Sequence, residues 1–291
     1  MDQDKLNITQ AIDAFKGNLT QQGRASATIL AYSKDIEQLT NFVTKSGKTS
    51  IKEFKKEDID AFKADLANSG YTTKSISRKI NSIKAFFSYM QTTGNTADNP
   101  AINVSHPKYD IKPPRILTKL EYRALRDACR EDSRMAAIVE LLLQTGMRIS
   151  ELANLKINDL DLSGNQITIR AYESHPERLV PLNAPTKESL VKYLALRPKS
   201  VNTSVFITKT GNPFLIRNIR SNLDRYFRIG GIEGAKVNDL RHTFIAQQLA
   251  QGSPLVYISK LVGHKRLSTT EKYLEFISEK PSKDKPKLID L

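Results

Sequence analysis

The stretch "LLLQTGMRISELANLKINDLDL", residues 141–162, joins an apolar run to a second run through a glycine and an arginine. Together with the preceding "RMAAIVE", the first run is apolar enough to predict a helix at the centre of a core. Gly146 is expected to end that helix, and "SELANL" to begin another. Arg148 lies at this junction and can point into a cleft, although a surface position is the simpler interpretation of one arginine taken alone.

Two stretches nearer the C-terminus carry further polar residues at defined places. "KVNDLRHTFIAQQLAQG", residues 236–252, predicts an amphipathic helix with Arg241 near its start. "LVGHKRLSTTEKYLEF", residues 261–276, has His264 after a glycine and Tyr273 nine positions later. A tyrosine of the core would be expected in an apolar stripe, so its place in a polar, basic segment raises the question of a function.

Strand signals occur between these stretches, and helix signals dominate the first hundred residues. "NQITIRAY" and "ERLVPL" predict a small β-hairpin, and "SVFIT" a further short strand. Near the N-terminus, "SATILAYSKDIEQLTNFV" and "SISRKINSIKAFFSYMQTTG" have apolar residues at helical spacing. The polar face of the latter is either solvated or lies along DNA phosphates, and it carries Lys74, Arg78, Lys79 and Lys84.

A proline-containing segment predicts two domains. "GNTADNPAINVSHPKYDIKPPRILT", residues 94–118, has four prolines and little periodicity. We therefore expect a helical N-terminal domain over 1–97, a linker over 98–116 and a second domain over 117–291 that ends in a charged tail. The predicted fold class is mostly α with a small β-hairpin or sheet.

Composition narrows the class of partner. The 291 residues are 39% hydrophobic and 26% charged, which is typical of a globular protein. The formal net charge is +14, and Lys and Arg outnumber Asp and Glu by 14 to 11 up to residue 100 but by 31 to 20 after it. Such an excess favours a polyanion, most often nucleic acid, over a merely basic surface. The second domain is then expected to hold much of the phosphate-binding surface.

The sequence disfavours a membrane protein, a secreted protein and a cysteine-rich metal protein. No run of about 18 apolar residues predicts a membrane span, and "MDQDKLNITQ" lacks the apolar core of a signal peptide. The single cysteine, Cys129, excludes an internal disulfide and a cysteine-rich metal site. We expect a cytoplasmic, nucleoid-associated protein without a membrane partner.

Taken together and in this order, "LLLQTGMRISELANLKINDLDL", "NDLRHTF" and "LVGHKRLSTTEKYLEF" resemble the signature motifs of the tyrosine recombinases, or phage integrases. "ERLVPL" resembles the end of that family's hairpin, and "SATILAYSKDIEQLTNF" its helical core-binding domain. The likeness covers nearly the whole chain and is closest in style to Xer-type and transposon-borne enzymes. It implies a two-domain clamp in which a core-binding domain and an α+β catalytic domain close around duplex DNA.

The resemblance also implies roles for individual residues. Tyr273 would be the nucleophile that forms a 3′-phosphotyrosine, and Arg148, Arg241 and His264 would donate hydrogen bonds to the phosphate. A tyrosine hydroxyl can store the phosphodiester bond without metal or nucleotide cofactor, and arginine suits a gathering negative charge because it stays protonated. Further DNA contacts are expected from the helix face that carries Lys74, Arg78, Lys79 and Lys84, and from Lys265 and Arg266.

Two departures from the family pattern concern proton transfer. The family usually has a histidine where this chain has Asn238, and asparagine does not exchange a proton near neutral pH. The place of the hairpin lysine, the family's general acid, falls near Glu173, and no lysine lies between Lys156 and Lys187. His175 is a candidate substitute, although a His-Pro turn is more often structural. We interpreted His242 as a support residue on its helix.

The resemblance leaves two hypotheses from different classes. The first is an active site-specific recombinase with altered acid-base residues, working as a homotetramer on two inverted-repeat sites through a Holliday junction and free in solution as a monomer or weak oligomer. The second is a recombinase fold retained as a DNA-binding regulator. A type IB topoisomerase is a remote third. Retention of Tyr273 with Arg148, Arg241 and His264 favours the first.

Overall fold

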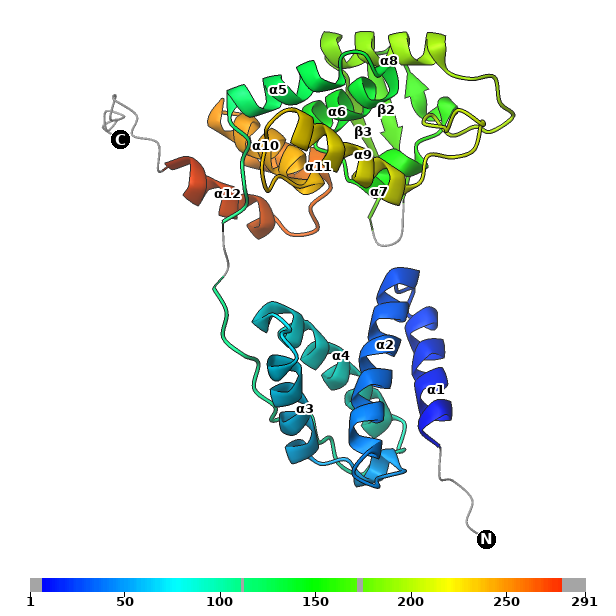
Figure 1. The fold of residues 1–291 in the computed structure, drawn as a ribbon, viewed down its shortest axis with the longest axis vertical. Helices are drawn as coiled ribbons and strands as arrows, with labels where there is room; N and C mark the ends of the chain where they lie inside the picture. The colour runs from blue at the N-terminus through cyan, green and yellow to red at the C-terminus, as the bar shows by residue number, and fades with distance from the viewer. Residues whose placement is uncertain (1–6, 111–112, 172–174, 279–291) are drawn as a thin grey trace. The chain divides into compact units, whose positions relative to one another are not determined.

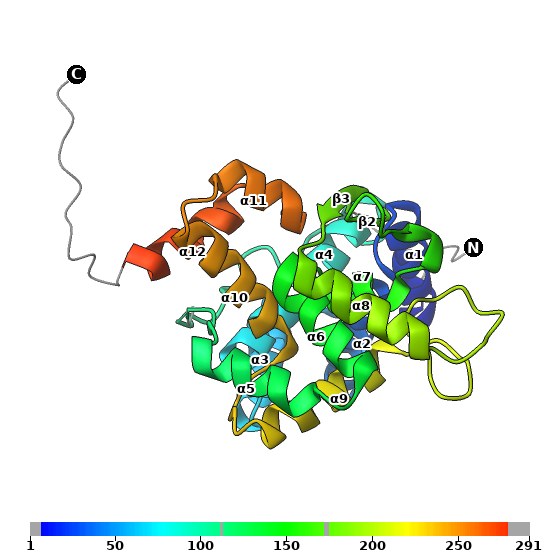
Figure 2. The same cartoon turned by 90° about the horizontal axis from the view of Figure 1, so that it is seen from above.

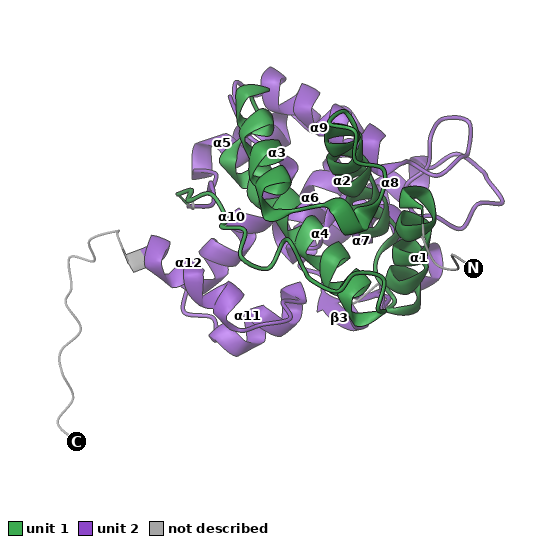
Figure 3. Ribbon diagram, turned by 90° about the horizontal axis from the view of Figure 1, so that it is seen from below, with its two compact units in different colours: residues 1–111 green, residues 112–291 purple. Residues whose placement is uncertain are grey.

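The chain forms two compact units, residues 1–111 and 112–291 (Figure 3). The computed structural model describes residues 7–110, 113–171 and 175–278. Helices predominate and one small sheet accompanies them, which confirms the predicted fold class. None of the helices in these described ranges is long and apolar enough to cross a membrane.

The first unit is a bundle of helices around an aromatic core (Figure 1). Phe15 of α1 lies edge-on to Phe86 of α4, and the apolar stripe of α4 predicted from its spacing is buried. Asn7 and Thr72 cap the first turns of α1 and α4. The elements are α1 (Ile8–Gln21), α2 (Ser26–Thr44), η1 (Ile51–Glu53), α3 (Lys56–Asn68) and α4 (Thr73–Thr92).

Part of the predicted linker packs into this first unit. Ala101 and Val104 are buried in the same cluster as the aromatic side chains of the bundle. Prolines end the helical pattern here, but apolar side chains still pack from the turn that follows Pro100. The compact unit therefore continues past residue 97.

A buried carboxylate corrects the expectation for Lys79. Asp35 of α2 accepts hydrogen bonds from the Nζ of Lys79 at 2.9 Å, from both terminal nitrogens of Arg78, and from the hydroxyl of Ser82. Burial alone would raise the pKa of Asp35, but these hydrogen bonds outweigh it and lower the pKa. Lys79 is 7% exposed. Its ammonium neutralises Asp35 and does not lie on an exposed face, so Lys79 is not placed to contact DNA as predicted.

The second unit is built around the apolar helix predicted from residues 134–145. Most of the side chains of α6 are buried, and α5, α8 and α10 pack against it (Figure 2). The helices are α5 (Lys119–Cys129), α6 (Ser133–Thr145), α7 (Ile149–Asn154), η2 (Ile157–Asp159), α8 (Ala184–Leu196), α9 (Ile216–Ile229), α10 (Val237–Ala250), α11 (Leu255–Val262) and α12 (Ser268–Ser278).

The predicted hairpin is present within a three-stranded antiparallel sheet of order β1-β2-β3. The strands are β1 (Leu160–Asp161), β2 (Gln166–Ile169) and β3 (Arg178–Pro181). Ile167 pairs with Val180, and both are buried against the core. The further strand expected at "SVFIT" is wrong, because this segment forms only isolated bridges, such as Ile207 with Pro213, while Phe206 fills the core.

Candidate active site

The junction between α6 and α7 depends on a glycine. Gly146 has φ of +60°, a conformation that L side chains rarely adopt, and an added Cβ would lie 2.4 Å from the ring of Phe244 on α10. This break ends α6 and lets Arg148 begin α7 from an extended backbone. The side chain of Arg148 is thereby directed at the end of α11.

Arg148 and Arg241 meet at the C-terminus of α11. Nη2 of Arg148 lies 3.0 Å from the carbonyl oxygen of Gly263, and Nη2 of Arg241 lies 2.8 Å from that of Val262. The last carbonyls of a helix lack intrahelical partners and carry partial negative charge, so they attract cations. Two arginines far apart in sequence are thus held together beside His264.

A buried carboxylate that sequence reasoning missed supports this arrangement. Glu151 accepts hydrogen bonds from Nη1 of Arg148 at 3.0 Å and from both terminal nitrogens of Arg178 at 3.0 and 2.8 Å. Burial alone would raise its pKa, but the bonds from Arg178 and the Arg148 backbone lower it overall. Its signal was its place three residues after Arg148, where its carboxylate accepts a hydrogen bond from the Arg148 backbone N–H at 2.7 Å.

Tyr273 of α12 lies between two imidazole rings. The ring of His264 stacks on it with centroids 6.4 Å apart, and Nδ1 of His242 lies 2.6 Å from its hydroxyl oxygen. His242 therefore contacts the hydroxyl of the predicted nucleophile, a contact that its interpretation as a support residue of the helix did not include. Nδ1 of His264 lies 2.7 Å from the hydroxyl of the buried Thr270, a partner not foreseen from the sequence.

The electrostatics favour an anion at this place. Three guanidinium groups, from Arg148, Arg178 and Arg241, surround the single carboxylate of Glu151. Burial, with the positive charge of Arg148, lowers the pKa of Arg241, yet a guanidinium remains protonated at neutral pH. Burial lowers the pKa of His264 to about 4 and raises that of Tyr273. Without DNA, both rings are therefore neutral at pH 7.

His175 lies near the charges of Arg148 and Glu151, whereas Asn238 is exposed to solvent. Among the described atoms, Nδ1 of His175 is buried without a hydrogen-bond partner, and burial followed by the charge of Arg148 lowers the pKa of His175. Glu173 lies outside the described residues. Asn238 is exposed in the first turn of α10. Arg178, a basic residue of the hairpin, is held by Glu151 and by the carbonyl of Leu261.

The remaining predicted DNA contacts differ in exposure. Lys265 and Arg266 are exposed in the turn between α11 and α12, beside His264. On α4, Lys74 is exposed, Arg78 is half-exposed while bound to Asp35, and Lys84 is partly buried with its Nζ 3.3 Å from the carbonyl of Ile102. These residues belong to two separate units.

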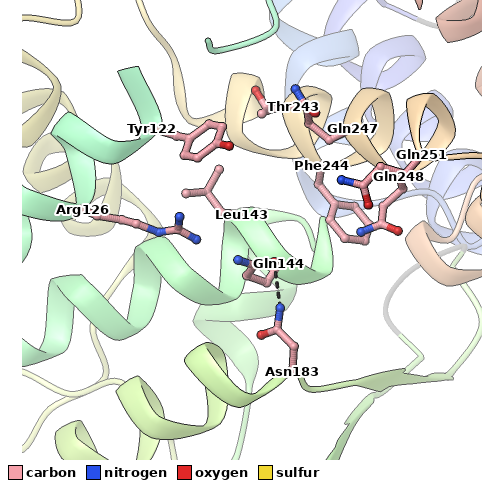
Figure 4. A pocket seen from close by; sticks show the side chains of 10 residues that line it. All are labelled: Tyr122, Arg126, Leu143, Gln144, Asn183, Thr243, Phe244, Gln247, Gln248 and Gln251. Atoms are coloured by element: carbon pink, nitrogen blue, oxygen red, sulfur yellow. Dashed lines mark hydrogen bonds between the residues drawn. The ribbon is translucent and has the colours of Figure 1, made fainter. Parts of the chain in front are cut away.

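A separate polar cavity of about 350 Å³ has Phe244 in its lining, but neither Tyr273 nor the arginines around Glu151 line it. It is lined by glutamines of α10, by Gln144 of α6 and by Asn183, which bonds to Gln144 at 2.9 Å (Figure 4). Within the described ranges, His, Cys, Asp and Glu do not gather in threes as a metal site would need.

Comparison with known proteins agrees with this geometry. Residues 115–279 match the phage integrase family, and residues 12–94 match the phage integrase N-terminal SAM-like domain. The tyrosine recombinase XerC of Thermodesulfovibrio yellowstonii is 34% identical over 266 residues, covering 87% of each chain. A crystal structure of XerA recombinase is 26% identical, with a TM-score of 0.54 over 94% of this chain and 99% of that one.

A lambda integrase tetramer bound to a Holliday junction has the same fold. Its TM-score is 0.79 at 15% identity, covering 97% of this chain and 81% of that one. The fold is therefore that of the tyrosine site-specific recombinases. By both its catalytic and its N-terminal segments, the chain belongs to the phage integrase family.

Proposed function

We propose that this chain is an active site-specific recombinase that cleaves and rejoins duplex DNA through Tyr273. The observation that carries the proposal is the meeting of Tyr273 with His264, and of Arg148 with Arg241, at the end of α11. Its XerC relative, similar over most of both chains, supports an enzyme of this class.

In the proposed reaction, the hydroxyl oxygen of Tyr273 bonds to a DNA phosphorus while the bond from phosphorus to the 5′ oxygen breaks. The product is a 3′-phosphotyrosine and a free 5′ hydroxyl, and attack by the 5′ hydroxyl of another strand reverses the step. Arg148 and Arg241 exchange their carbonyl partners for the non-bridging oxygens, whose charge rises in the transition state.

His264 fits the role of a neutral donor. If the hydroxyl of Thr270 donates to Nδ1, the proton of the neutral imidazole is on Nε2, which is then available to a phosphate oxygen. Because the pKa of His264 is low without DNA, a bound phosphate is expected to raise it. His264 therefore donates in either protonation state.

The partners follow from the same proposal. Lys265 and Arg266 beside the site, with Lys74, Arg78 and Lys84 on the first unit, would contact phosphates of a duplex with inverted repeats. The lambda integrase tetramer on a Holliday junction supports a homotetramer on two DNA sites for this chain. The first unit would then act as a core-binding domain and the second as the catalytic domain, in a cytoplasmic, nucleoid-associated enzyme.

One specific observation keeps a second function open, a DNA-binding regulator without cleavage. The chain lacks a lysine between Lys156 and Lys187, and Asn238 cannot transfer a proton, so both acid-base groups of the family differ. His175, near Arg148 and Glu151, is the proposed acid that would replace the lysine.

A nicked suicide duplex separates the two functions. Duplexes selected from random-sequence DNA by binding to the protein would be nicked at successive central positions, so that the cleaved end diffuses away and the intermediate accumulates. A recombinase forms a covalent protein–DNA adduct on this probe. Tight binding without an adduct at any nick position would support the regulator instead.

A further inference from the structure

The contact between His242 and Tyr273 has no part in the phosphate clamp. His242 is in α10 and Tyr273 is in α12, two helices that pack against each other. Nδ1 of His242 lies 2.6 Å from the tyrosine hydroxyl oxygen, at the short end of the range for an O–H donor. Tyr273 is 6% exposed, so this hydroxyl meets a protein partner rather than bulk water.

The protonation states give this hydrogen bond a direction. Burial lowers the pKa of His242 and raises that of Tyr273, so both are neutral at pH 7. Around His242, the charge of Asp239 raises the pKa while that of Arg241 lowers it, and the ring of His264 stacks on that of Tyr273. If Tyr273 donates to Nδ1, its hydroxyl proton is satisfied; the reverse arrangement leaves a buried hydroxyl proton without this partner.

Neighbouring groups are less suited to accept this proton. Asn238 lies one helical turn before His242 and on the same face of α10, but its amide has no basic atom and it is exposed. Nδ1 of His264 is engaged with Thr270. His242 is the imidazole whose ring nitrogen contacts the attacking oxygen.

We propose that His242 is the general base of the cleavage step, a role that rests on the proposed recombinase function. As the Tyr273 oxygen bonds to phosphorus and the bond to the 5′ oxygen breaks, the hydroxyl proton moves to Nδ1 of His242. The leaving 5′ oxygen takes its proton from a separate acid. On rejoining, the 5′ hydroxyl attacks phosphorus and gives its proton back to the conjugate base of that acid. The bond from phosphorus to Tyr273 breaks, and the His242 imidazolium returns its proton to the tyrosine oxygen.

Two substitutions separate proton transfer from mere positioning. In His242→Asn the amide oxygen can still accept the tyrosine hydrogen bond near the place of Nδ1, but it cannot take the proton. His242→Ala removes both. We expect both variants to cleave the nicked, binding-selected duplex on the order of 100-fold more slowly than wild type in single turnover.

The pH dependence supplies a second readout. On a duplex whose leaving 5′ oxygen is replaced by sulfur, which leaves without a proton, the wild-type rate should rise with pH and level off once His242 is neutral, below its ordinary pKa of 6.5. The rate of His242→Asn should keep rising about tenfold per pH unit toward the pKa of Tyr273, because hydroxide must then remove the proton. His106→Asn is the matched control, because His106 bonds to Ser77 in the first unit. This variant should cleave at the wild-type rate.

The outcomes distinguish this inference from the function on which it rests. If His242→Asn cleaves within about threefold of the wild-type rate while His242→Ala is slow, His242 only positions the tyrosine. If both variants cleave at nearly the wild-type rate, the contact has no part in cleavage. In either case wild type still forms its adduct, so the recombinase function stands. No adduct from wild-type protein on duplexes that it binds would overturn both.

Discussion

Arg148 and Arg241 already donate hydrogen bonds within the protein without DNA. These bonds determine whether the two arginines contribute more to DNA binding or to the cleavage rate. Apart from the bond of Arg148 to Glu151, their guanidiniums rest on the carbonyl oxygens of Gly263 and Val262, which are neutral acceptors. A phosphate oxygen is an ionised acceptor and gives a hydrogen bond roughly twice as strong. We therefore expect these arginines to gain most from the transition state, where the charge on the oxygens is greatest, and less from DNA binding itself.

Arg148→Ala should accordingly lower the cleavage rate by about 100-fold or more while duplex affinity changes little. Single-turnover cleavage of the nicked duplex and filter binding of the intact one would measure the two effects. Arg130→Ala is the control, because Arg130 is 72% exposed in its side chain and pairs with Asp127 at the end of α5. A cleavage rate within about twofold of wild type would remove Arg148 from the site.

His175 can be tested as the acid for the leaving 5′ oxygen. A substrate with sulfur in that position leaves as a thiolate and needs no proton. If His175 is the acid, His175→Ala should slow the normal substrate by about 100-fold and the sulfur substrate little. Because burial lowers the pKa of His175 below its ordinary 6.5, the protonated acid should become scarcer, and the normal reaction slower, as the pH rises through that lowered pKa.

Two other results would contradict that role. Equal slowing of both substrates by His175→Ala would mean that the residue positions DNA or supports the hairpin. If the unmodified protein cleaves the sulfur substrate much faster than the normal one, and His175→Ala changes neither rate, the site works without an acid.

At the scale of elements, α7, α11 and β3 are joined through one buried carboxylate. Glu151 of α7 binds Arg178 of β3, which in turn donates to the carbonyl of Leu261 in α11. Removing one partner of a buried ion pair leaves an uncompensated charge, which typically costs about 3–5 kcal/mol. Glu151→Gln should therefore lower the free energy of unfolding of the second unit by an amount of this order.

The pH dependence of that loss has a defined sign. The pKa of Glu151 is lower in the folded protein than its ordinary value of 4.5. Its stabilising contribution is therefore complete above that value and is lost as the pH falls through the folded pKa. Urea unfolding of wild type and Glu151→Gln should give a large difference at pH 7 that narrows in acid. A difference that stays constant down to pH 3 would show that the carboxylate charge is not responsible.

Local patterns were enough to predict some elements, but not their contacts. The apolar run of α6, its end at Gly146 and the pairing of β2 with β3 follow from spacing and from residue types that suit a turn or strand. Lys79 looks like its neighbour Arg78 in the sequence, and both bind Asp35 of another helix, yet helix packing buries the ammonium and leaves the guanidinium half exposed. The contacts of His242 and Glu151 likewise depend on how distant helices pack.

The net charge of the whole molecule predicts how DNA affinity depends on salt. With a net charge of +14, DNA binding should release counterions from several phosphates, so duplex affinity should fall steeply as salt rises. Fluorescence anisotropy across a range of salt concentrations would give the slope of log affinity against log salt. A slope near zero would contradict a DNA-binding protein of either proposed kind, recombinase or regulator.

The central claim is that Tyr273 makes the covalent bond to DNA. Tyr273→Phe removes only the hydroxyl oxygen, and its ring can still pack between His242 and His264. Denaturing electrophoresis of the nicked-duplex reaction, followed by mass spectrometry of the DNA-linked peptide, is the most direct measurement. The account predicts an adduct on Tyr273 in wild type, and none in Tyr273→Phe although that variant binds the same duplex. An adduct that persists in Tyr273→Phe, or that maps to another residue, would contradict it.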